Sequence, residues 1–228
     1  MNVLETKLRK KEIDDLIDYI EDYNQKTFSK TIDNDSKDFY RFVSKQLVFF
    51  KYILNAYPNS YFIKVLISDF LSLILNDLKN ERRYYYLNQR SIIENYVRLL
   101  VEDETYITHV TKQAFLDLQA KYASDITERD YGKIMNEYKI ACSYIHGGEY
   151  LKKHLVNSFE ECLQIKPKIS KRKRKNQIGQ FIDLINILNN LFLIHKAEEI
   201  DSSFHRSKLV LKYLMGTKYV EKLREINK

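Results

Sequence analysis

The sequence predicts an all-α protein, an up-and-down helical bundle of about eight to nine helices with no β-sheet. Only five glycines and two prolines occur in 228 residues, so the chain has few of the breaks that hairpin and sandwich loops need. Long segments also place apolar residues three and four positions apart, which is the spacing of one helix face. The length suits one large core, and we predict a single helical domain over residues 1–228.

The first half of the chain predicts five helices. The first covers residues 6–27, within an acidic amphipathic segment at 1–30. The second begins at a cap, Asp35 or Ser36, and ends before Pro58. The third runs to residue 78 and the fourth covers 81–101, and we expect the two to be continuous or only kinked. The fifth covers 104–122.

The second half predicts four more helices joined by turn signals. The sixth begins at Asp125 or Thr127 and ends on His146, where Gly147 and Gly148 provide a helix stop. The remaining helices cover 149–165, 177–199 and 203–228, the last of them broken at Gly216. We expect residues 36–165 to form the main bundle and 177–228 the C-terminal helices.

The net charge of +7 comes from one segment. Residues 166–175 contain seven Lys and Arg and no acid, which leaves 31 basic residues against 31 acidic ones elsewhere. We expect a basic loop at 166–176, and such a cluster binds polyanions with strong salt dependence. The alternative is a solvated loop, or one that pairs with the acidic first helix of this chain or of a second copy. The candidate nucleic-acid contacts are Lys171, Arg172, Lys173, Arg174 and Lys175.

Other composition features indicate a cytoplasmic protein without a metal or cofactor. Cys142 and Cys162 fall at apolar helical positions and give neither a disulfide framework nor a zinc motif. Cys142 and His146 would supply only half of a metal site. The N-terminal residues contain no apolar leader, and the two most apolar stretches, 62–75 and 181–194, are interrupted by polar side chains. Both are therefore expected to be core helices, and no membrane partner is expected.

Two pairs of side chains form the candidate site. Arg90 and Glu94 are four residues apart and share one helix face, which Arg98 extends. Ser143 and His146 are three residues apart at the end of the sixth predicted helix. If the two faces meet, a cation, a carboxylate, a hydroxyl and an imidazole come together.

Such a set suits metal-independent RNA cleavage. A base removes the 2′-OH proton, and a cation stabilises the charge that develops on the phosphoryl oxygens. In this interpretation His146 is the acid or base, Arg90 holds the phosphate and Glu94 orients one of them. The alternative is a buried Arg–Glu–His hydrogen-bond network that only fixes how two helices align.

The pattern Arg90-x-x-x-Glu94, followed about fifty residues later by Tyr138-x-x-x-x-Ser143-x-x-His146, resembles the HEPN-like superfamily of α-helical bundles. The resemblance covers roughly residues 60–165. It implies a homodimeric ribonuclease or toxin of bacterial phage defence, of the abortive-infection or toxin–antitoxin type, with RNA as a partner and a protein partner or antitoxin as another. His146 would be its catalytic histidine.

The chain departs from the superfamily at one point. Many active members carry an arginine four to six intervening residues before the histidine, and the residues here are Ala141, Ile140 and Lys139. Only Lys139 is cationic, and a lysine lacks the bidentate fork of arginine. Arg90 would then take this role from the neighbouring helix. Otherwise the protein is an inactive RNA-binding or protein-interaction module of a defence complex.

Overall fold

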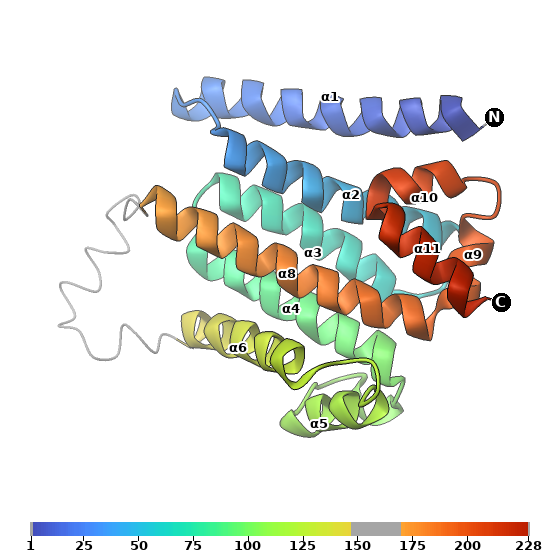
Figure 1. The fold of residues 1–228 in the computed structure, drawn as a ribbon. Coiled ribbons are helices and arrows are strands. Elements are labelled where there is room, and N and C mark those ends of the chain that lie inside the picture. Colours follow the sequence, from blue (N-terminus) through green and yellow to red (C-terminus); the bar gives the residue numbers. More distant parts are fainter. Residues whose placement is uncertain (1, 147–169, 228) are drawn as a thin grey trace.

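Ten α-helices make up the described part of the chain, residues 2–146 and 170–227 of a computed structural model, and these residues contain no β-strand (Figure 1). The all-α prediction is confirmed for them. The helix predicted at 149–165 lies outside the described residues, as does Cys162. The helices are α1 (Asn2–Phe28), α2 (Asn34–Ala56), α3 (Tyr61–Leu78), α4 (Arg82–Val101), α5 (Lys112–Lys121), α6 (Glu128–Ile145), α8 (Lys171–His195), α9 (Ala197–Ser203), α10 (Lys208–Met215) and α11 (Thr217–Ile226).

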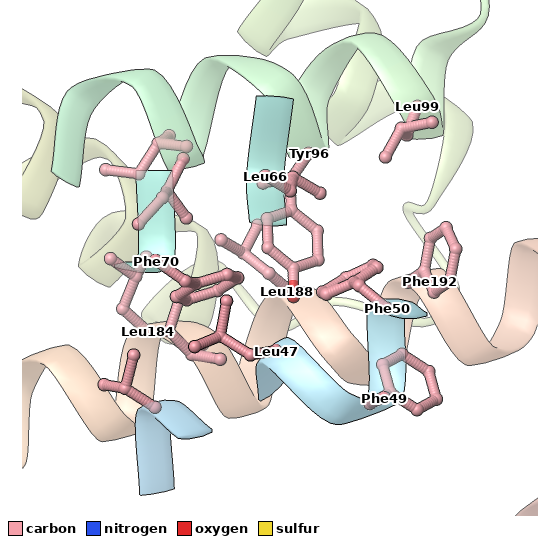
Figure 2. Close-up of a cluster of buried hydrophobic side chains, with 14 of the residues drawn as sticks. Leu47, Phe49, Phe50, Leu66, Phe70, Tyr96, Leu99, Leu184, Leu188 and Phe192 are labelled. Atoms are coloured by element: carbon pink, nitrogen blue, oxygen red, sulfur yellow. The ribbon is translucent and has the colours of Figure 1, made fainter. Parts of the chain in front are cut away.

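Four of these helices, α2, α3, α4 and α8, share an aromatic core (Figure 2). Phe50 of α2 lies at its centre and is fully buried. Its ring centroid is 6.1 Å from that of Phe70 in α3, 5.7 Å from that of Tyr96 in α4 and 5.7 Å from that of Phe192 in α8. Burying one such side chain contributes about 1.5–3 kcal/mol, so this cluster is a main reason why the four helices pack together.

The expected continuity of the third and fourth helices is wrong, because α3 and α4 form an antiparallel hairpin (Figure 1). The chain reverses at Asn80, which has a left-handed φ of 56°. Polar side chains pair across the hairpin: Asn76 donates to Asn88 at 2.8 Å, and Asn95 lies 3.4 Å from Asp69. Asparagine is the residue after glycine that best tolerates a left-handed backbone, and it permits the reversal here.

Several predicted boundaries also differ from the structure. The second helix is capped by Asp33, whose carboxylate accepts from the Ser36 N–H at 3.0 Å. The fifth predicted helix divides into a short 3-10 turn, Glu104–Tyr106, and α5. Instead of a helix over 177–199 and one from 203 onward, the chain forms α8, the short α9, and then α10 and α11. The last two are separated, as expected, at Gly216, whose φ is 92°.

The basic loop predicted at 166–176 is wrong from residue 171 onward, because α8 already begins at Lys171. The Ser170 hydroxyl caps this helix by accepting from the Lys173 N–H at 3.3 Å. Lysine and arginine are good helix formers, so the charged run extends α8 once the cap has started it. Residues 166–169 lie outside the described residues.

Helix α8 is the one helix in the described residues that is long and apolar enough to cross a membrane by length and composition. Half of its most apolar window is buried inside the bundle. Its buried side chains include Phe181, Leu188 and Phe192, which pack against other helices of the core. This position matches the core helix that the sequence predicts.

Candidate functional site

Helix α6 ends at Ile145, and His146 is its C-cap, at the point where the sequence predicts the helix stop. Thr127 caps its start by accepting from the Asp130 N–H at 3.1 Å, as one of the two predicted caps. Ile134 and Ala141 are fully buried, and α6 packs along α4 (Figure 1). The His146 N–H closes the last turn on the Cys142 carbonyl at 3.0 Å, and its side chain is exposed.

The two helices bring Arg90 and His146 together, although 56 residues separate them in the sequence. Arg90 Nη1 lies 3.4 Å from His146 Nε2. Because a guanidinium has donors only, Arg90 donates to this nitrogen in the tautomer that carries its proton on Nδ1. This geometry places Nε2 of His146 beside a cation.

Glu94 is the centre of the hydrogen bonds in this site. Its Oε1 accepts from Arg90 Nε at 2.7 Å and from the Tyr138 hydroxyl at 2.9 Å, while Arg98 Nη2 lies 3.9 Å from Oε2. The Glu94 side chain is only 14% exposed. Through the two hydrogen bonds at Oε1, Glu94 orients Arg90 and Tyr138.

The surroundings shift the pKa of two of these groups. Burial, followed by the nearby Glu94 carboxylate, raises the pKa of Tyr138 well above its usual range. Burial of the Arg90 guanidinium works against its charge, but the hydrogen bond and attraction from Glu94 outweigh it and raise the pKa of Arg90. The Arg90 guanidinium also lies 5.7 Å from the Tyr138 ring centroid. Arg90 therefore stays charged and Tyr138 stays a neutral donor over the physiological pH range.

Two predicted members do not join the cluster. Ser143 and Lys139 are both exposed, and within residues 2–146 and 170–227 neither makes a hydrogen bond or an ion pair with Arg90, Glu94 or His146. The expected meeting of a cation, a carboxylate and an imidazole is thus observed, while the hydroxyl comes from Tyr138 in place of Ser143. Tyr138 stands in the motif, but its place in the sequence gives no hint that its hydroxyl reaches across to α4.

Arg98 has a structural role next to the site. Its Nε donates to the Tyr106 carbonyl at 2.9 Å and its Nη1 to Asn95 at 3.2 Å. Its guanidinium carbon lies 5.6 Å from the Phe62 ring centroid. These contacts connect α4 with α3 and with the turn that follows α4, which fixes the helix that carries Arg90.

The basic residues divide into two groups at the start of α8. Arg174 turns inward: its Nη1 donates to Asp77 Oδ1 at 2.7 Å, its Nη2 contacts the other carboxylate oxygen, and its side chain is 19% exposed. This position does not support the prediction that Arg174 contacts nucleic acid. In the described part of the chain, no ion pair joins this segment to the acidic α1. The exposed group is Lys171, Arg172, Lys173 and Lys175.

Within residues 2–146 and 170–227, no group of three or more His, Cys, Asp or Glu side chains is arranged to hold a metal ion. No protein-family model, curated protein or solved structure matches the chain.

Proposed function

We propose that this chain is a HEPN-like, metal-independent ribonuclease or toxin of bacterial phage defence, acting in abortive infection or in a toxin–antitoxin pair. The observation that carries the proposal is the 3.4 Å approach of Arg90 Nη1 to His146 Nε2 between α4 and α6. It brings a guanidinium, a group that suits phosphate, next to an exposed imidazole, a group that suits acid–base catalysis. Arg90 retains N–H donors beyond those that it gives to Glu94 and His146.

In the proposed reaction, His146 Nε2 takes the proton of an RNA 2′-OH. The O2′–P bond forms and the P–O5′ bond breaks, which leaves a 2′,3′-cyclic phosphate and a 5′-hydroxyl. Arg90 donates to the phosphoryl oxygens as their charge increases. A phosphate that takes up the Arg90 donors also frees Nε2 to act as the base. The leaving O5′ receives its proton from water or from the His146 of a second copy.

The test is RNA cleavage by the purified full chain in EDTA. Cleavage to 2′,3′-cyclic phosphate ends is expected, with about a 100-fold or greater loss for His146→Ala, as for a general acid or base. His205→Ala is the matched control, since His205 is an exposed histidine in the turn between α9 and α10. Equal cleavage by the wild-type and His146→Ala proteins would exclude the proposal.

A homodimer is part of this proposal, since the resemblance implies one and a two-fold pair is the commonest oligomer. RNA is the expected polyanion, and a protein partner or antitoxin is the expected regulator. Mass photometry of the full chain at several concentrations measures the dimer directly. A monomer at every concentration that still cleaves RNA would remove this part of the proposal and leave the site in place.

The second candidate function is a non-catalytic RNA-binding or protein-interaction module in a defence complex. Four exposed cations, Lys171, Arg172, Lys173 and Lys175, stand at the start of α8, and no acid lies in its first turn. Cations are unfavourable at a helix N-terminus because the macrodipole is positive there, so a polyanion would relieve this charge. RNA binding that survives His146→Ala but weakens steeply when the four are changed to glutamine would favour this function. Binding unchanged in the glutamine variant would argue against it.

A further inference from the structure

A hollow with a volume of about 520 Å³ lies between α1, α2, α8 and α10. Helices α1, α2 and α10 lie on the side of the bundle away from α6, so the hollow is separate from the Arg90–His146 site (Figure 1). Its lining includes Lys10, Lys45, Gln46, Tyr213 and Gly216. Its volume lies within the range of small-molecule sites in proteins.

The charged side chains of this cleft leave an excess of positive charge. Arg41 serves both of its acids, at 3.6 Å from Asp14 and 3.6 Å from Asp38. Lys10 and Lys45, by contrast, make no ion pair with any carboxylate in the described part of the chain. Two acids with one shared arginine and two unpaired lysines favour an anion in the cleft.

Lys45 is the more unusual of the two lysines because it is half-buried. Its ammonium lies 4.7 Å from the Tyr213 ring centroid, and burial lowers the pKa of the lysine. A cation withdrawn from water without a carboxylate partner costs free energy. An anionic ligand would offset that cost.

A buried chain of hydrogen bonds directs Gln46 toward the same cleft. Tyr96 is fully buried, and its hydroxyl donates a hydrogen bond to Asn189 Oδ1 at 2.7 Å. The Asn189 NH₂ group therefore faces α2, where it donates to Gln46 Oε1 at 2.9 Å. Gln46 is 2% exposed and lines the cleft, yet its own NH₂ group donates to no residue in the described ranges. The N–H groups of this amide are therefore available to an acceptor in the cleft.

The start of α11 lies at the rim of the cleft. Gly216 lines the cleft and is the N-terminal flanking residue of α11, where no side chain of the described residues caps the first N–H groups. The N–H of Gly216 itself donates to the Lys212 carbonyl at 2.9 Å. A Cβ atom at Gly216 would meet nothing within 4 Å, so its backbone is open. Uncapped N–H groups at a helix start favour an anion, in agreement with Lys45 and Gln46.

We propose that this hollow, the Lys45 cleft, binds a small organic anion. Its carboxylate or phosphate group lies between the Lys45 ammonium and the Gln46 amide, and its planar or apolar body packs on Tyr213 and Phe42. The ligand enters a site that already exists in the folded chain, with its donors held by the core.

Isothermal titration calorimetry on the full chain tests the proposal. The probes are phenyl phosphate and benzoate, with inorganic phosphate and benzyl alcohol as their head-only and body-only counterparts. One of the two ring-bearing anions is expected to bind at a single site more tightly than either counterpart, and which one binds identifies the head group. Binding by neither anion would overturn the proposal.

Variants then locate the site. Lys45→Met should weaken binding by about tenfold or more, as expected for a lost charge-assisted contact, while Lys45→Arg should retain part of it. The matched control is Lys51→Met on the same helix, whose side chain is 56% exposed and which should bind like wild type. Unchanged binding by Lys45→Met, or an equal loss in Lys51→Met, would refute the assignment.

A second measurement uses the unmodified protein and does not depend on the folding of a variant. Acetylation of lysines is followed by mass spectrometry with and without the bound anion. The ligand should protect Lys45 and leave Lys51 unchanged. Equal labelling of Lys45 in both samples would overturn the proposal.

Discussion

Arg174 attaches the start of α8 to the end of α3, and Arg174→Met removes that attachment. The substitution keeps an apolar stem near the Phe39 ring, whose centroid lies 5.6 Å from the guanidinium carbon. It leaves the Asp77 carboxylate, 8% exposed, with the Tyr40 hydroxyl at 3.0 Å as its one side-chain donor among the described residues. Breaking a buried ion pair from one side costs about 3–5 kcal/mol. Because Arg174 is itself 19% exposed, we expect the lower end, about 3 kcal/mol.

Urea unfolding measures this loss. Lys173→Met is the control, because Lys173 is the exposed neighbour in the same turn, and it should stay within about 0.5 kcal/mol of wild type. The double variant with Asp77→Asn should cost less than the sum of the single changes by about 1–3 kcal/mol. If Arg174→Met unfolds within about 1 kcal/mol of the control, or the cycle shows no coupling, the Arg174–Asp77 ion pair does not hold α8 to α3.

Three further changes test other parts of the structure. Tyr138→Phe removes the hydroxyl that donates to Glu94 at 2.9 Å and should lower the free energy of unfolding by about 1 kcal/mol; no loss in urea unfolding would show that this bond contributes nothing. Burial and then Lys121 lower the pKa of His195, so the unfolded state binds its proton more readily. The free energy of unfolding is therefore highest above the ordinary histidine pKa and falls as the pH drops through the lowered pKa of His195. His195→Gln should flatten this pH dependence in melting curves from about pH 8 to 5, and an unchanged slope would contradict the prediction. Ser29→Gly relieves an exposed left-handed residue (φ 51°) and should raise stability by about 0.5–1 kcal/mol, whereas a lower melting temperature would argue against strain there.

The helical class and the core faces could be predicted from the sequence, because they depend on local spacing. Phe181, Leu188 and Phe192 recur at helical intervals, and all three are buried in α8 as expected. The pairing of Arg90 with Glu94 follows in the same way from their four-residue separation within one helix. The spacing of apolar residues in the sequence therefore determines which side chains share a helix face.

The packing partners of those faces could not be predicted. The reversal at Asn80 uses neither glycine nor proline, so the sequence contains no strong break between α3 and α4. A run of charged residues usually predicts a loop, but here α8 begins at Lys171. The Ser170 cap and the helix propensity of lysine and arginine outweigh the repulsion between the positive charges. The approach of His146 to Arg90 depends on how α6 lies on α4, which no local pattern encodes.

The hydrogen-bonded chain from Tyr96 through Asn189 to Gln46 restricts how this core can change over evolutionary time. Replacing any one of the three by an apolar residue leaves a buried polar neighbour unpaired, at a cost of about 1–3 kcal/mol. Replacing all three together removes every unpaired group and is far less costly. The three positions, on α4, α8 and α2, should therefore be inherited as a set, since each single step away passes through a less stable protein.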